Sequence, residues 1–203
     1  MLGRVSNRRL PRRLAQLYVG LWLFGVSMAL LVRSELGNMP WDVFHQGLVR
    51  QLGGTIGTWS IIVGALVLLL WLPLRQRPGV GTLANIVLIG LAINATLAVL
   101  PPIETLAVAV PVLVAGVLLN GVATGAYIGA GMGPGPRDGL STGLAAKGLS
   151  LRLVRTSIEL AVLGAGWLLG GEVGVGTVLY AVAIGAITHV TIPALRVRAP
   201  AAT

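Results

Sequence analysis

The chain has 203 residues, of which 55% are hydrophobic and only 10% are charged, and its mean hydropathy is +0.88. An ordinary soluble domain carries about a quarter charged residues, so this composition excludes a soluble globular fold. The net charge of +9 is better explained by membrane topology than by nucleic-acid binding. The absence of cysteine excludes disulfides, thiolate metal sites and cysteine nucleophiles. The composition therefore indicates a polytopic membrane protein.

Stretches that lack Asp, Glu, Lys and Arg predict six membrane-spanning helices. Each helical span needs roughly 20 mainly apolar residues. The fifth span reaches this length only if Glu159 is accepted inside the membrane. In chain order, the predicted spans are residues 14–33, 57–74, 81–100, 108–131, 152–170 and 174–195. The fold class predicted from them is an all-α membrane bundle.

The basic residues predict the orientation of this bundle. All of them except Arg33 and Arg50 fall on one side of the membrane if both termini are cytoplasmic. Cytoplasmic loops are enriched in Lys and Arg, so we expect residues 1–13 and residues 196–203 to be cytoplasmic tails. The lipid bilayer is the first partner that this arrangement implies.

The chain resembles itself when it is shifted by 95 to 96 residues. At an offset of 96, the segment 25–48 shares seven identities with residues 121–144, and at an offset of 95 the string GVGT at 79–82 recurs at 174–177. Two blocks at nearly one offset predict a duplicated unit, with repeats at 14–100 and 101–195. Each repeat would hold three spans, so the second would enter the membrane from the opposite side. This is the inverted-repeat arrangement of many transporters.

Each repeat carries the pattern GxxPxDxxxxGL after its first span, with Pro40 and Asp42 in one copy and Pro136 and Asp138 in the other. Proline suits the first turn of a helix, and a carboxylate there complements the helix dipole. The segments that follow are too short and polar to span, so we expect short helices that lie at the interface or enter the membrane as half-helices. Either the motifs are only helix caps, or the half-helices point at a solute path with both Asp as cation or proton ligands. Inverted repeats would place Asp42 near the outer face and Asp138 near the inner face.

The two copies differ beside the Asp residues. Trp41 aligns with Arg137, and His45 aligns with Ser141. Arg137 beside Asp138 would accept an anion or form a local ion pair. His45, one helical turn from Asp42, could relay a proton, or it could simply be a solvated interfacial side chain.

Other polar residues are expected at membrane depth. Glu159 is a functional candidate, as intramembrane charges are by default, or else a structural partner of Arg155 one turn earlier. Asn94 aligns with His189, so both third spans carry a polar group at the same level. Such residues bridge helices or line a pore. Asn85 and Asn120 raise the same question.

Glycines recur at steps of four along the predicted fourth span. One glycine face allows a close helix contact, either within the bundle or in a homodimer or with a partner protein. The glycines are Gly121, Gly125, Gly129 and Gly133.

The segments GNMPWDVFHQGL and YIGAGMGPGPRDGLSTGL resemble the signature of the YczE/YyaS/YitT family of bacterial membrane proteins, particularly its YczE-like branch. The resemblance covers nearly the whole chain. It implies a small integral protein of the bacterial cytoplasmic (inner) membrane. It does not imply a substrate.

The sequence contains no HExxH, GxSxG or GxxxxGK[ST] motif, so neither an enzyme nor a cofactor or metal site is expected. The duplicated Pro-Asp motif favours a small-solute transporter, which could be proton-coupled, with a path between the repeats. A channel is one alternative. The other is a non-transporting accessory subunit that uses the glycine face as its docking surface.

Overall fold

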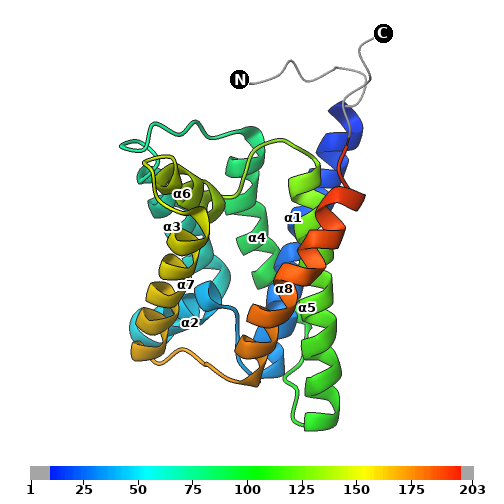
Figure 1. Cartoon of the computed structure of the whole chain (residues 1–203). Coiled ribbons are helices and arrows are strands. Elements are labelled where there is room, and N and C mark those ends of the chain that lie inside the picture. Colours follow the sequence, from blue (N-terminus) through cyan, green and yellow to red (C-terminus); the bar gives the residue numbers. More distant parts are fainter. Residues whose placement is uncertain (1–9, 198–203) are drawn as a thin grey trace.

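The computed structural model describes residues 10–197, which form eight α-helices and no strand. Figure 1 shows them as one bundle. The helices are α1 (Leu10–Ser34), α2 (Pro40–Leu52), α3 (Ile56–Leu69), α4 (Val80–Val99), α5 (Leu106–Gly129), α6 (Pro136–Ala145), α7 (Leu151–Leu168) and α8 (Val175–Ala194). The predicted all-α class is confirmed.

The helix order repeats, because a long helix, a short one, a medium one and a long one follow each other twice. The six predicted spans fall on α1, α3, α4, α5, α7 and α8, and the two Pro-Asp segments form the short helices α2 and α6. Residues 10–13, which we expected in the N-terminal tail, belong to α1. The basic residues expected in the tails at positions 4, 8, 9 and 198 lie outside the described residues.

Four helices of the described chain, α1, α4, α5 and α8, are long and apolar enough to cross a membrane. A fifth span results if α2 and α3, which meet at a bend of 111°, count as one broken span. The helix α3 has only 14 residues, and α7 carries Arg152, Arg155 and Glu159. The sequence prediction of six spans therefore exceeds the number of helices that qualify by length and composition.

The long helices α1 and α5 pack side by side and run in opposite directions (Figure 1). Gly20 near the start of α1 lies against Ala123 and Tyr127 near the end of α5, while Gly116 in the first half of α5 lies against Leu31. Helix α4 packs on α1, and α8 packs on α5. Fully buried residues at the centre include Leu17, Leu21, Met28, Leu31 and Ile93.

The glycine face of α5 is covered within the bundle. A Cβ on Gly121 would overlap the side chain of Ile187, one on Gly125 would lie 2.6 Å from Thr191, and one on Gly129 would lie 2.5 Å from the Leu195 carbonyl oxygen. These three neighbours belong to α8 or follow it directly. Gly133 continues the series beyond the helix, next to Gly79 at the start of α4. The face is therefore not free to dock a second copy or a partner.

Each GVGT string contacts the loop in front of the other repeat's short helix. The Gly81 N–H donates to the Met132 carbonyl at 2.9 Å, and the Gly176 N–H donates to the Leu36 carbonyl at 2.7 Å. The next residue in each loop is a glycine with positive φ, 121° at Gly133 and 109° at Gly37, where other residues would be strained. The two repeated sequence blocks thus form the two sides of one kind of backbone contact. The GVGT string supplies the N–H donor, and the loop in front of the other repeat's short helix supplies the carbonyl. The protein makes this contact twice.

The repeats differ in how their last two helices pack. In the first repeat, α3 lies against α4, where Gly57 has no room for a side chain beside the Gly90 carbonyl and its N–H donates to Asn94 Oδ1 at 3.0 Å. In the second repeat, α7 packs mainly on α2 and barely touches α8. Gly185, the counterpart of Gly90, has no atom near the position of a Cβ. His189, the counterpart of Asn94, is exposed.

We expect Gly90→Ala to destabilise the bundle and Gly185→Ala not to do so. The added methyl at position 90 would lie 2.5 Å from the Gly57 carbonyl oxygen, and such overpacking costs about 1–3 kcal/mol. At position 185 the methyl meets open space, so the gain in helix propensity should stabilise by about 0.5–1 kcal/mol. The free energy of unfolding in detergent measures both effects. Equal losses in the two variants would contradict the packing described.

Candidate functional site

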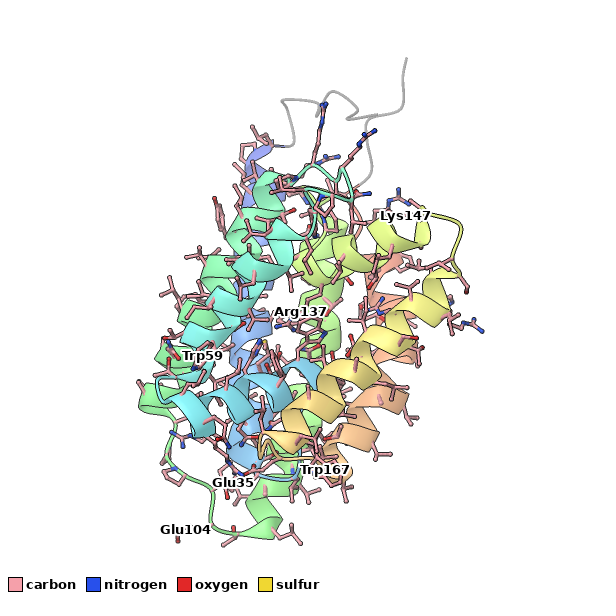
Figure 2. All side chains as sticks on the ribbon, turned by 90° about the vertical axis from the view of Figure 1, so that its left-hand side faces the viewer. Glu35, Trp59, Glu104, Arg137, Lys147 and Trp167 are labelled. Atoms are coloured by element: carbon pink, nitrogen blue, oxygen red, sulfur yellow. The ribbon has the colours of Figure 1, made fainter. Side chains whose placement is uncertain are left out.

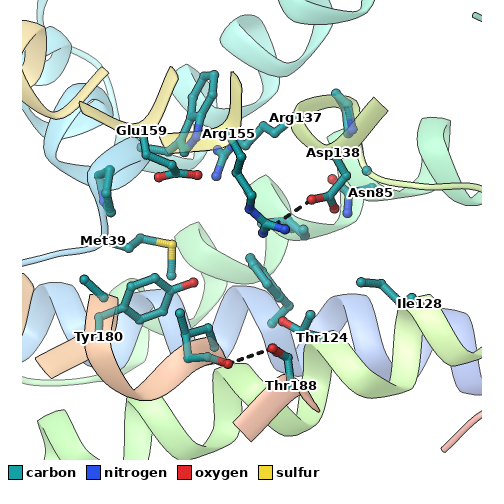
Figure 3. Close-up of a pocket in the computed structure, with 18 of the residues that line it drawn as sticks. Met39, Asn85, Thr124, Ile128, Arg137, Asp138, Arg155, Glu159, Tyr180 and Thr188 are labelled. Atoms are coloured by element: carbon teal, nitrogen blue, oxygen red, sulfur yellow. Dashed lines mark hydrogen bonds and ion pairs between the residues drawn. The ribbon is translucent and has the colours of Figure 1, made fainter. Parts of the chain in front are cut away.

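A cavity of about 570 Å³ lies where the N-termini of α2 and α6 approach α7 and α8 (Figure 3). Its aromatic walls come from Phe24, Trp41, Tyr127 and Tyr180. Its charged lining residues are Arg137 and Asp138 on α6 and Arg155 and Glu159 on α7. The volume is in the range of small-molecule binding sites, which combine apolar walls with a few placed polar groups.

Asp138 lies in the first turn of α6 and is bound on both oxygens. The Tyr127 hydroxyl donates to Oδ2 at 3.0 Å, and Arg155 Nη2 lies 3.6 Å from Oδ1. Arg155 is therefore paired with Asp138 and not with Glu159, contrary to one of the two roles that the sequence suggested for Glu159. Glu159 faces the cavity beside Arg137 (Figure 3).

Trp71 fixes the N-terminus of α6. Its indole N–H donates to the Pro136 carbonyl at 2.9 Å, and its ring occupies the place where a side chain at position 139 would lie, so that only glycine fits there. One residue before Gly135, the Pro134 carbonyl accepts from the Thr82 hydroxyl at 2.8 Å. The first turn of α6 is thus held from α4 and from the end of α3, which keeps Arg137 and Asp138 directed at the cavity.

Asp42 and His45 are fully buried at the start of α2, directly behind the cavity wall. His45 Nδ1 lies 3.2 Å from Asp42 Oδ1, and His45 Nε2 lies 3.4 Å from Arg137 Nη2. The alternative in which His45 is a solvated interfacial side chain is therefore wrong. Asp42 Oδ2 is buried without a hydrogen-bond partner among the described residues.

Trp41 and Arg137, which align between the repeats, contact each other. The Arg137 guanidinium lies over the Trp41 ring, 4.6 Å from its centroid, in the geometry of a cation–π interaction. This contact brings the N-termini of both short helices together, and their first residues, Pro40 and Pro136, line the same cavity. We expected Asp42 and Asp138 near opposite faces; the structure instead links them through His45 and Arg137.

The remaining polar residues that we expected at membrane depth mostly join helices to each other. Asn94 accepts from the N-terminus of α3, as described above, and His189 lies outside the charged cavity. Asn120 bridges three helices, because its Nδ2 donates to Ser27 Oγ at 2.9 Å and its Oδ1 accepts from the Tyr180 hydroxyl at 3.2 Å. Within residues 10–197, no group of three His, Asp or Glu residues could hold a metal ion.

Sequence reasoning missed several residues of the cavity. Tyr127 and Tyr180 line it, but from the sequence each was considered only as part of a span. Arg155 also lines it, but was considered only as a cytoplasmic charge and as a partner of Glu159. A tyrosine in an otherwise apolar span needs a hydroxyl partner when it is buried, and this signal could have marked Tyr127 and Tyr180. Asn85 was noted for its depth alone, and it too lines the cavity.

The profile of a family described as "Family of unknown function (DUF6198)" matches residues 11–193. The chain belongs to this family. An "Uncharacterized membrane protein YczE" of Bacillus subtilis is 41% identical over 172 residues, which cover 84% of this chain and 80% of that protein. An "Uncharacterized protein" of Haemophilus influenzae is 40% identical over 174 residues, covering 85% and 80%.

A more distant relative, the "Uncharacterized protein YyaS" of Bacillus subtilis, is 26% identical over 182 residues, covering 86% of this chain and 90% of that protein. These relatives confirm the resemblance to the YczE/YyaS family. The name of the YczE relative describes a membrane protein, in line with the apolar helices of this chain. No solved structure shows a significant match to the chain.

We expect Trp71→Phe to destabilise the protein by about 1–3 kcal/mol, because the buried hydrogen bond from the indole to the Pro136 carbonyl would be lost and the smaller ring would leave a gap. Trp167→Phe is the matched control, since Trp167 is 65% exposed and should change stability by less than about 0.5 kcal/mol. The free energy of unfolding in detergent checks both. A Trp71→Phe variant as stable as the control would show that the indole does not hold α6.

Proposed function

We propose that this protein is a small-solute transporter of the bacterial cytoplasmic membrane, and that its solute binds in the cavity between two inverted repeats. The observation that carries the proposal is a cavity with four charged lining residues beside two helix pairs that differ in packing. Helices α3 and α4 pack together (the closed pair), whereas α7 and α8, at the corresponding places of the second repeat, stand apart (the open pair). Transporters of this construction bind near the midplane, where half-helices from both repeats meet, and they alternate between conformations in which the repeats exchange roles.

Several contacts support the inverted arrangement. The long helices α1 and α5 are antiparallel, and the hydrogen bonds Gly81–Met132 and Gly176–Leu36 occupy equivalent places in the two repeats. The short helices α2 and α6 then enter from opposite sides as half-helices. Backbone of this kind is tolerated at membrane depth where it is buried in protein or lines a wet cavity, and both conditions are met here.

The two ends of the cavity differ. At the end where α8 begins, Gly174 packs on the Leu36 carbonyl and Gly171 packs on that of Val43, so that the backbone closes this end. At the other end, Thr156 on α7 and Thr188 on α8 both line the cavity, and no close helix contact joins them. This open end is also the end at which α1 begins and α8 finishes (Figure 1). With cytoplasmic termini, the cavity faces the cytoplasm.

The lining indicates which kind of solute would fit. Two arginines and two carboxylates give the cavity balanced charge, which suits a polar or zwitterionic organic molecule better than a simple ion. The aromatic walls provide apolar contact for the rest of such a molecule. A closed end favours this transporter over a continuous channel.

We expect a cysteine pair at Glu159 and Ala181 to form a disulfide when the open pair of helices closes. These positions are the counterparts of Gly64 and Ile86 in the closed pair, where a Cβ on Gly64 would lie 3.8 Å from that of Ile86. A disulfide needs Cβ atoms about 3.5–4.5 Å apart. In this conformation Glu159 on α7 and Ala181 on α8 both line the cavity. Since the chain has no cysteine, oxidation followed by electrophoresis or mass spectrometry detects the bond directly.

The pair Gly64→Cys with Ile86→Cys is the matched control and should cross-link at once. If the Glu159–Ala181 pair never cross-links in membranes while the control does, the open side is permanent and alternating access is refuted. A channel or an accessory subunit would then explain the fold better. A disulfide that forms would support the transporter.

Orientation has its own test. Glu104 and Lys147 lie toward opposite ends of the bundle (Figure 2), and both are exposed. We expect an impermeant maleimide to label Glu104→Cys in intact cells and Lys147→Cys only after permeabilisation, because the basic residues favour cytoplasmic termini. The two basic residues on the outer side are engaged, Arg33 with the Leu97 carbonyl and Arg50 with Glu172. The reverse labelling pattern would invert the proposed orientation.

A further inference from the structure

We propose that His45 is a proton-binding site, and that protonation of its imidazole breaks the contact with Arg137 and so separates the N-termini of α2 and α6. The inference deepens the proposed function, since it supplies the coupling ion of that transporter. The protonation step itself requires no solute, so it can be tested separately.

The hydrogen-bond donors determine the state of His45 in this structure. A guanidinium has only donors, so Arg137 Nη2, at 3.4 Å from His45 Nε2, leaves that nitrogen as an acceptor. The proton of the imidazole must then be on Nδ1, where it is donated to Asp42 Oδ1 at 3.2 Å. His45 is therefore neutral, with a lone pair on Nε2 directed at Arg137.

Protonation removes this arrangement. When cavity water delivers a proton, an N–H bond forms at the Nε2 lone pair, and two positively charged donors then face each other. Asp42 stabilises the imidazolium from the other side, with its second oxygen buried and free of partners among the described residues. The proton and Arg137 thus compete for one nitrogen, and a single proton decides between two arrangements.

The competition acts across the repeats because His45 belongs to α2 and Arg137 belongs to α6. When Arg137 leaves His45, a carboxylate is available to it, because Glu159 on α7 lies beside it in the cavity (Figure 3). The other charges of the cavity, Asp138 and Arg155, are paired with each other at 3.6 Å. Protonation of His45 therefore favours an arrangement in which α6 moves away from α2 toward α7.

The chain allows a direct measurement, because it contains only two histidines. His189 is exposed on α8, so His189→Gln leaves His45 as the only imidazole and serves as the parent protein. In the parent, nitrogen NMR of labelled histidine at pH 8 should show the Nδ1–H tautomer. In Arg137→Gln, the titration of the imidazole should move up by about 1–3 pH units, because a nearby positive charge is lost.

Two controls accompany this variant. Asp42→Asn should move the titration down, since a negative partner is lost, and Arg155→Gln should leave it nearly unchanged, since Arg155 contacts Asp138 instead. An Nε2–H tautomer in the parent would overturn the proposal without any further variant. A titration that does not respond to Arg137→Gln would overturn it as well.

The conformational half of the proposal is measured by distance. Spin labels at Gln51→Cys and Lys147→Cys, near the far ends of α2 and α6, should report a longer distance at pH 5 than at pH 8. The change should disappear in His45→Gln, and a pH response that persists there would overturn the proposal. Failure of the Glu159–Ala181 cross-link, with the titration of His45 as expected, would refute only the transporter. A cross-link that forms, together with a His45 titration that does not respond to Arg137→Gln, would refute only the proton site.

Discussion

The backbone contact between each GVGT string and the opposite loop is the constraint on which the rest of this structure depends. A chain that stops one helix and starts another in an apolar interior leaves N–H and C=O groups without partners, and each buried unsatisfied group is costly. The N–H groups of Gly81 and Gly176 satisfy the carbonyls of Met132 and Leu36. Each repeat thereby supplies a backbone donor to the loop in front of the other repeat's short helix.

This exchange brings the beginnings of the two short helices together. Because both loops are held from the opposite repeat, the helices that follow them begin close to each other, where Trp41 and Arg137 meet. These two residues occupy aligned positions of the two motifs, and a cation over an aromatic ring is an attractive contact. The contact therefore joins the two motifs at the candidate site.

Much of the fold could be predicted from two features of the sequence. Long stretches without charged residues mark most of the helices, and the repeated residue identities predict that the order of helices repeats. The short helices α2 and α6 could be predicted too, since proline and aspartate mark a helix start. The sequence could not predict that the short helices begin at one cavity, because helix depth depends on contacts such as Trp71 with Pro136. Nor could it predict that α7 packs away from α8. Gly90 and Gly185 are both glycines at corresponding positions, and only their neighbours in the structure differ.

That last difference bears on the proposed function. The helix pairs at corresponding places of the two repeats pack differently, and packed interfaces switch between discrete states. The closed pair keeps Gly57 and Gly90 in contact, while the open pair keeps Gly185 free of contact at the same level. Glycine at an open position gains nothing there and lowers helix stability. Its presence is explained if α7 closes on it in the other arrangement, where a side chain would block the approach as it would at Gly90.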